Sequence, residues 1–343
     1  MKLNNLNDNL IYNSIKEVEK AEEVPAGYVE IKLSTKGLVG APANFHIRNF
    51  KVGEILDLAL SSEEELPARL INILNQMIYE DIDVNNFHEK EVEELMLYIY
   101  ASFYSDTFED VTFPLIKEDF DFLFKNNPEL IEDINEKRYV PKTTISISQG
   151  VDVYDIPENF KKDITISNKE TGFFVTFGIV KYSDRLLVKR WLDKFYENET
   201  AKFQHIADEL SKKHPVSEED EAAYNEFLSR KFNTLAEMSR IVSIKNYNGM
   251  DVENLSLSDK YKLMASDARI DFGLISKLIE RQNKMKFGIK PFVKMQNPLT
   301  YQMCERRFSF RIPSLLQAMQ VFGSDKYDDG YDDEDGTSME GSL

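Results

Sequence analysis

Tyr28-Val-Glu-Ile-Lys-Leu-Ser34 and Phe45-His-Ile-Arg48 are the two runs that organise the first part of this chain. Apolar and polar side chains alternate in both runs, which is the period-two pattern of a half-buried strand. Gly37 and Gly40 lie between the two runs, where glycine favours a turn. The sequence therefore predicts a β-hairpin over residues 28–49.

Helical periodicity follows this hairpin. Apolar residues recur there at spacings of three and four, which places them on one face of a helix. Two groups show this spacing, the first being Leu70, Leu74, Met77 and Ile78, and the second Val92, Leu95, Met96, Ile99 and Phe103. A weaker helical pair is predicted at about 117–136.

The helical period returns at about residue 182. Ser217 follows Pro215 and precedes a run of acids, which predicts the N-cap of a long helix over about 218–246. A later helix is marked by Ile270, Leu274 and Leu278 and is expected to end near Gly288.

Strand-like alternation appears in two further places. Residues 144–148 and 173–177 alternate between apolar and polar side chains, which predicts a small β region over 139–180. Phe308, Phe310 and Ile312 alternate with polar residues and predict one closing strand.

The predicted fold class is therefore α+β, mainly α-helical, with helical bundles and two small β regions, an N-terminal hairpin and a central to C-terminal sheet. We expect five parts along the chain: an N-terminal arm at 1–27, a β-hairpin plus helical domain at 28–138, the small β region at 139–180, a helical domain with closing strands at 181–323, and an acidic disordered tail at 324–343.

Composition excludes several classes of protein. The formal net charge of −18 repels phosphate backbones, so direct nucleic-acid binding is not expected. A single cysteine among 343 residues excludes a disulfide framework and fits a reducing compartment. The longest apolar run, 95–101, is far shorter than the roughly 20 residues that cross a bilayer, so we expect a soluble protein made in the cytosol.

The sequence also lacks familiar catalytic patterns. Its four histidines (His46, His88, His205 and His214) are never three or four residues apart, and no glycine-rich phosphate loop occurs. Paired acids such as Asp119 and Asp121 are interpreted as chance pairs in a chain this rich in carboxylates. His46 is expected at the surface, and Cys304 is expected to be a small core residue. We therefore expect no catalysis, no cofactor and no metal.

Two charged segments near the C-terminus are candidate docking sites for a partner. Arg306, Arg307 and Arg311 form a basic concentration, with Arg307 and Arg311 expected on one strand face. Residues 324–343 carry a net charge of −7 and include Asp328, Asp329, Asp332 and Asp333. An exposed face with packed aliphatic stems is the simpler interpretation of the arginines. The alternative is that they dock an acidic partner, either the tail of this chain or that of a neighbour.

The order of segments resembles the baseplate-hub protein family of T-even-like long-tailed phages. The resemblance rests on the run Val29-Glu-Ile-Lys-Leu-Ser-Thr-Lys-Gly37, on Phe45-His-Ile-Arg48, and on a helix that opens near Val52. Later matching stretches are 144–180, Ser183-Asp184, Met264-Ala-Ser-Asp267, Gly288 and 301–316. The family's closing strand follows a cysteine pair, whereas only Cys304 is present here, so a zinc ribbon is not supported.

This resemblance implies a tail or baseplate morphogenesis protein, structural or chaperone-like and not catalytic. Its expected partners are other phage structural proteins and copies of itself. It would be found in the host cytoplasm during assembly and in the tail of the virion. One alternative is an acidic decoy that binds a basic nucleic-acid-binding protein of host or phage. Another is an enzyme of unfamiliar type, which would require a concave cluster of carboxylates or arginines.

Overall fold

The computed structural model describes residues 24–62, 65–212, 214–267, 277–278, 280–281 and 284–324. These residues belong to two compact units, each built from separated pieces of the chain. Unit 1 falls within Met1–Asn49, Glu63–Leu95 and Val153–Lys290, and unit 2 within Phe50–Ser62, Met96–Asp152 and Pro291–Leu343.

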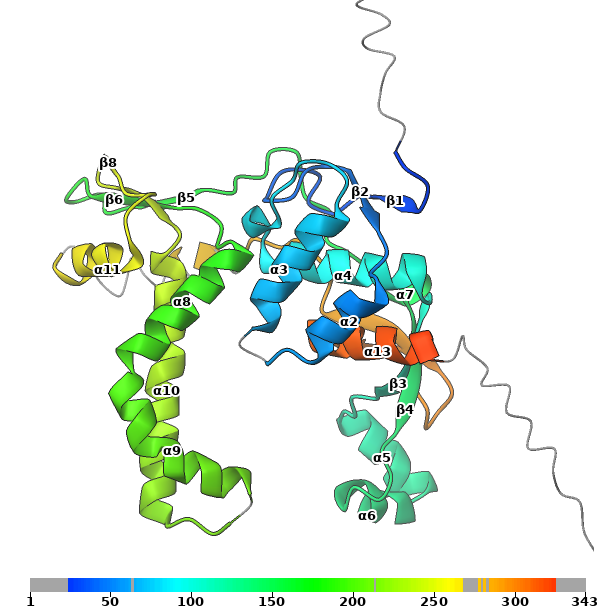
Figure 1. Ribbon diagram of the computed structural model, residues 1–343. Helices are drawn as coiled ribbons and strands as arrows, with labels where there is room; N and C mark the ends of the chain where they lie inside the picture. The colour runs from blue at the N-terminus through cyan, green and yellow to red at the C-terminus, as the bar shows by residue number, and fades with distance from the viewer. Residues whose placement is uncertain are drawn as a thin grey trace, which may run out of the picture. The chain divides into compact units, whose positions relative to one another are not determined.

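The predicted fold class is confirmed, because the described part of the chain is α+β, with helices predominating over four small sheets (Figure 1). Within the described part of the chain, no helix combines the length and the apolar character needed to cross a membrane. The expected division into consecutive domains differs from the two units, since each unit is assembled from segments far apart in the sequence.

The hairpin of unit 1 is confirmed. Strand β1 (Tyr28–Ile31) pairs antiparallel with β2 (Phe45–Arg48), with Tyr28 opposite Arg48 and Ile31 opposite Phe45. The inward side chains Ile31, Phe45 and Ile47 are buried, as the alternation requires. Helix α3 (Leu66–Met77) and the 3-10 turn η1 (Val84–Asn86) follow in this unit. Helix α4 (Glu89–Phe103) begins in unit 1, and its residues from Met96 belong to unit 2.

The rest of unit 1 combines one sheet with helices. Strands β5 (Ile164–Ser167), β6 (Phe174–Phe177), β7 (Ile244–Tyr247) and β8 (Met250–Asp251) form an antiparallel sheet in that order. Its helices are α8 (Tyr182–Phe195), α9 (Glu197–Ser211), α10 (Glu218–Ile241) and α11 (Leu257–Ala265), and α8 and α10 lie side by side (Figure 1). One apolar core joins sheet and helices, and it includes Val175, Phe177, Val188, Phe227 and Met238.

The long helix begins where predicted but ends earlier. Ser217 is its N-cap, and its hydroxyl accepts a hydrogen bond from the Asp220 backbone N–H. The prediction that the helix continues to 246 is wrong, because α10 ends at Ile241 and residues 244–247 form β7. Strand β7 pairs with β6, a partner that helical periodicity alone does not reveal.

Unit 2 contains helices α2 (Val52–Ala59), α5 (Lys117–Asn126), α6 (Glu129–Asn135), α7 (Ile147–Gly150) and α13 (Ile312–Ser324). Its strands form two antiparallel pairs, β3 (Thr107–Thr112) with β4 (Lys142–Ser146), and β9 (Phe292–Gln296) with β10 (Met303–Arg307). Helix α2 packs on α13, and β4 lies close to β9. Helices α5 and α6 confirm the predicted helical pair.

The predicted β region at 139–180 is not one sheet. Strand β4 pairs with β3 in unit 2, whereas β5 and β6 belong to the four-stranded sheet of unit 1. Alternation shows that a segment is extended but does not identify its hydrogen-bonding partner. The predicted β region at 139–180, which was defined by position in the chain, therefore combined strands that belong to two different sheets.

The predicted closing strand is displaced. The strand is Met303–Arg307, while Phe310 lies between it and helix α13, which begins at Ile312. Phe310 is buried, with its ring centroid 5.8 Å from that of Phe108. Pro313 falls in the first turn of α13, where a missing backbone N–H leaves no helical hydrogen bond unmade. Of the later predicted helix, Ile270 and Leu274 lie outside the described residues.

Candidate functional site

Two buried glutamates of α4 hold the hairpin loop of unit 1. Glu91 accepts hydrogen bonds from the Thr35 hydroxyl at 2.6 Å and from the backbone N–H groups of Gly40 and Ala41, each at 3.1 Å. Glu94 accepts two at 2.7 Å, from the backbone N–H and the hydroxyl of Ser34. Both carboxyl groups belong to residues at most 1% exposed. The loop that links β1 to β2 is therefore fixed by a buried polar network.

Burial and hydrogen bonding have opposing effects on the pKa values of these two glutamates. It raises the pKa of Glu91 and of Glu94, while the hydrogen bonds that each carboxylate accepts lower the pKa and partly offset the rise. Gly40 permits the close approach, since a Cβ there would lie 2.2 Å from the carbonyl oxygen of Asn86. The sequence reasoning missed both glutamates. The only available signal was their spacing of three residues on one predicted helix.

Unit 1 also contains a pocket of about 900 Å³. Five cationic side chains line it: Lys90, Arg185, Lys189, Lys231 and Arg240. Helices α8 and α10 supply four of them, and the first turn of α4 supplies Lys90. Asp193 is the one carboxylate among the lining residues that the structure describes, so the lining carries a net charge of +4.

Two of these cations are neutralised within the unit. Arg185 pairs with Glu89, and the Lys231 ammonium lies 3.0 Å from Asp193. Lys189 and Arg240 form no ion pair with any carboxylate in the part of the chain that the structure describes. Both are half-buried, where water screens their charges less than on an open surface.

The neighbouring groups of the pocket are neutral or apolar. Burial lowers the pKa of His88 to about 3, so its imidazole is uncharged near pH 7. The Lys90 ammonium lies 5.1 Å from the ring centroid of Phe287, within cation–π range. Apolar side chains, including Leu192 and Leu235, complete the lining. The sequence did not reveal this site, because its cations are spread between residues 90 and 240.

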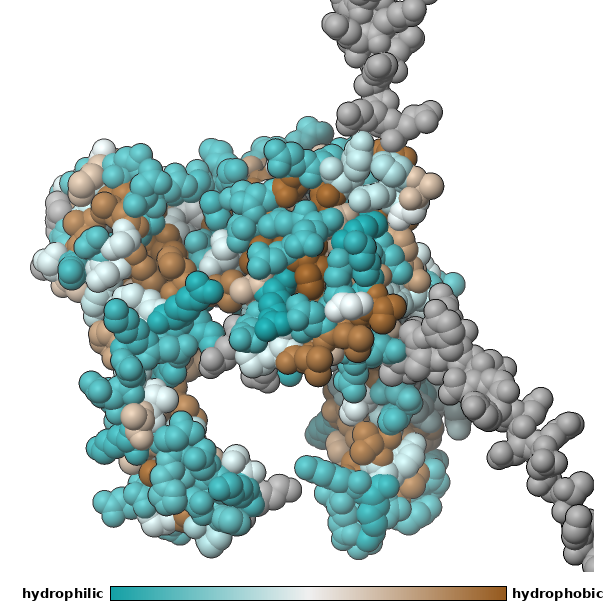
Figure 2. All heavy atoms as spheres, in the orientation of Figure 1, coloured by the Kyte–Doolittle hydropathy of each residue, from teal (hydrophilic) through white to brown (hydrophobic). Residues whose placement is uncertain are grey.

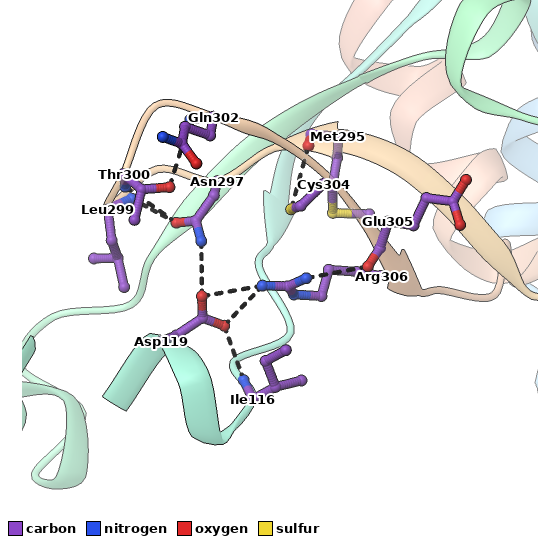
Figure 3. A network of polar contacts seen from close by, with 10 residues as sticks. All are labelled: Ile116, Asp119, Met295, Asn297, Leu299, Thr300, Gln302, Cys304, Glu305 and Arg306. Carbon is purple, nitrogen blue, oxygen red and sulfur yellow. Dashed lines mark hydrogen bonds and ion pairs between the residues drawn. The ribbon is translucent and has the colours of Figure 1, made fainter. Parts of the chain in front are cut away.

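In unit 2, Asp119 is the centre of a second buried network (Figure 3). Its carboxylate lies 3.0 and 3.1 Å from one guanidinium nitrogen of Arg306, and it accepts hydrogen bonds from the Asn297 amide at 2.7 Å and the Ile116 backbone N–H at 2.9 Å. The side chains of Asp119 and Arg306 are only 4% and 11% exposed. Arg306 also lies 5.1 Å from the ring centroid of Phe113. This network ties α5 to the β9–β10 pair.

The structure corrects the predicted docking residues. Arg306 is not available to a partner, because it is buried against Asp119. Arg307, at the end of β10, and Arg311, just before α13, are exposed, but they do not share a strand face. Asp119 is likewise not half of a chance pair of acids, because its buried carboxylate binds Arg306 and Asn297. The acidic candidates Asp328, Asp329, Asp332 and Asp333 lie outside the described residues.

Two further candidates have ordinary surroundings. Cys304 is half-buried, with its sulfur 3.5 Å from the Met295 carbonyl oxygen, and burial raises the pKa of its thiol. His46 is half-buried, with Nδ1 2.7 Å from the Glu80 carboxylate. The described residues contain no cluster of three or more His, Cys, Asp or Glu side chains that could hold a metal ion.

Helix α2 presents an apolar stripe to solvent. Val52, Leu56 and Leu60 are 73%, 53% and 85% exposed, and their spacing of four places them along one side of the helix. Ile55 and Leu58 on the other side are buried, consistent with the packing of α2 on α13. Figure 2 shows hydrophobic surface over this part of unit 2. We call the three exposed residues the α2 stripe.

No family model, no curated protein and no solved structure matches this chain.

Proposed function

We propose that this chain is a structural component or assembly chaperone of the tail or baseplate of a long-tailed phage. It works by binding other phage structural proteins or copies of itself, and it catalyses no reaction. It acts in the host cytoplasm during assembly and takes its place in the tail of the virion.

The α2 stripe is the observation that carries this proposal. Fully burying a Val or Leu side chain contributes about 1.5–3 kcal/mol, so a partner that covered all three residues would gain several kcal/mol. An amphipathic helix with apolar residues on its outer side is a common element of helix-mediated recognition. The inner side of α2 is already packed in unit 2, which leaves the outer side for another chain.

The hairpin adds support to the phage assignment. The segments that carry the resemblance, 29–37 and 45–48, fold into β1, β2 and the loop between them. Glu91 and Glu94 hold that loop through buried hydrogen bonds. A loop fixed in this way suits a protein whose surface must match a partner, since little conformational entropy is lost on binding.

The test is affinity capture of the tagged chain from cells infected by the phage that encodes it. We expect identified tail or baseplate proteins to co-purify with the unaltered chain and to be lost with Leu56→Lys. Leu187→Lys is the matched control, because Leu187 is 49% exposed on α8, close to the value for Leu56, and should retain them.

Two results would contradict the proposal. One is capture of a basic nucleic-acid-binding protein without tail or baseplate proteins, which would favour an acidic decoy. The other is equal loss of partners with Leu56→Lys and Leu187→Lys. Circular dichroism and thermal melting of each variant would establish that it is folded.

A further inference from the structure

The pocket of unit 1 has a charge opposite to that of the chain. The whole chain carries a formal charge of −18, yet the described lining of this pocket carries +4. Like charges that face one space repel one another, and half-buried charges repel more strongly than fully solvated ones. Arg185 and Lys231 are already paired with carboxylates, so the repulsion that an anion in the pocket would relieve is mainly that of Lys189 and Arg240.

The size and the apolar lining restrict what that anion is. A volume of about 900 Å³ lies within the range of roughly 300–1,000 Å³ typical of binding pockets, and it exceeds what a single small ion fills. Apolar side chains such as Ile164, Val180 and Leu192 line the pocket together with the cations. A ligand that satisfies both features carries several negative charges together with apolar or aromatic groups.

One segment of this chain has that chemistry. The run Asp325-Lys-Tyr-Asp-Asp-Gly-Tyr-Asp-Asp-Glu-Asp335 interleaves two tyrosines with acidic pairs. Residues 324–343 together carry a net charge of −7, the densest negative charge in the sequence. Tyrosine rings can pack on apolar side chains while neighbouring carboxylates pair with Lys or Arg.

We propose that the cationic pocket of unit 1 binds the C-terminal segment 325–343 of a second copy of this chain. The segment falls within the residue range of unit 2, whereas the pocket belongs to unit 1, so a contact between two copies would join different surfaces of the chain. Such a head-to-tail contact builds rings or filaments instead of closed pairs.

Sedimentation velocity of the purified full chain at low ionic strength tests this. We expect the unaltered chain to associate as its concentration rises. Both a chain that ends at Ser324 and the double variant Lys189→Glu/Arg240→Glu should remain monomeric. Salt should weaken the association of the unaltered chain, because exposed charges are screened within about 10 Å at 0.1 M ionic strength.

Mixing the two altered chains is the sharpest arm of the experiment. The double variant keeps its tail, and the truncated chain keeps its pocket, so the mixture should form a one-to-one complex that neither chain forms alone. Arg190→Glu is the matched control, because Arg190 is an exposed cation of α8 outside the pocket and its reversal should leave association unchanged.

A labelled peptide of residues 325–343 measures the pocket directly. It should bind the truncated chain at least about tenfold more tightly than it binds the truncated double variant, which corresponds to about 1.4 kcal/mol. Replacing both peptide tyrosines by serine should weaken binding, because the apolar part of the lining then lacks a partner.

Three outcomes would overturn the proposal. The first is an unaltered chain that stays monomeric while the peptide binds only the truncated form, which would mean that the tail binds within its own chain. The second is a peptide bound no more tightly than inorganic phosphate, which would make the pocket a small-anion site. The third is a mixture of the two altered chains that forms no complex.

Discussion

Replacing Asp119 by alanine should strongly destabilise unit 2. The carboxylate of Asp119 neutralises the buried guanidinium of Arg306 and accepts hydrogen bonds from Asn297 and Ile116 (Figure 3). Its removal leaves the Arg306 charge 11% exposed and without its counter-ion. Two hydrogen-bond donors lose their acceptor at the same time.

The size of the effect follows from this geometry. Removing one partner of a buried ion pair destabilises a protein by about 3–5 kcal/mol, because the other charge stays buried and uncompensated. Total stabilities are about 5–15 kcal/mol, so the loss is a large fraction of the whole. With a urea m-value of roughly 2 kcal/mol/M, the unfolding midpoint should fall by about 2 M.

The chain contains separate probes for the two units. Trp191, its single tryptophan, lies in unit 1, and Cys304, its single cysteine, lies in unit 2 on the strand that carries Arg306. Alkylation of Cys304 across a urea series reports the opening of unit 2. Fluorescence of Trp191 provides the internal reference.

Two comparisons isolate the ion pair from general damage. Asp121→Ala, at an exposed neighbouring acid, should change stability by less than about 0.5 kcal/mol. Arg306→Met should be as harmful as Asp119→Ala, while the double variant should lose at least about 2 kcal/mol less than the sum of the single losses. A loss below about 1 kcal/mol for Asp119→Ala, or additive effects in the double variant, would refute this reasoning.

Three further predictions concern unit 1 and the tail. Burial, reinforced by the negative charge of Glu89, raises the pKa of Glu93 from the ordinary 4.5 to about 7. Between pH 4.5 and about 7 the folded protein keeps a proton that the unfolded chain loses, so unit 1 becomes less stable as the pH rises through this range. Glu93→Gln should remove this pH-dependent loss and stabilise unit 1 by up to about 3 kcal/mol at pH 8 but not at pH 4. Urea unfolding followed by Trp191 fluorescence measures this, and equal effects at both pH values would contradict the prediction. Gly40→Ala should destabilise the protein by at least about 2 kcal/mol in thermal or urea unfolding, because the added Cβ would lie 2.2 Å from the Asn86 carbonyl oxygen. Gly53→Ala, by contrast, places its Cβ in open space and should stabilise α2 by up to about 1 kcal/mol. Deleting 324–343 should leave the melting temperature of dilute protein nearly unchanged while altering partner binding, and a fall of many degrees would show that the tail is part of the fold.

The sequence by itself determined the local elements of this protein. The hairpin at 28–49, the helices around Leu74 and Ile99, and the N-cap at Ser217 were all predicted, and the structure confirms them. Each depends on spacing or capping within about a dozen residues. Interactions over that range leave a direct trace in the order of side chains.

Tertiary structure decided which strands pair and where α10 ends. Strand β4 could have joined β5 by position in the chain, but its partner is β3 in unit 2. Residues 244–246 were included in the predicted long helix, yet they belong to β7, which pairs with β6. A backbone segment takes its hydrogen-bond partner from the whole fold, so alternation or helical spacing alone does not identify it.

The candidate sites were decided entirely by tertiary structure. Arg306 read as a surface cation until it was paired with Asp119, 187 residues earlier in the chain. The cations of the pocket meet only because α8 and α10 pack side by side next to the start of α4. Whether a charge is buried, paired or left facing a cavity depends on neighbours that are remote in sequence, and periodicity contains no information about them.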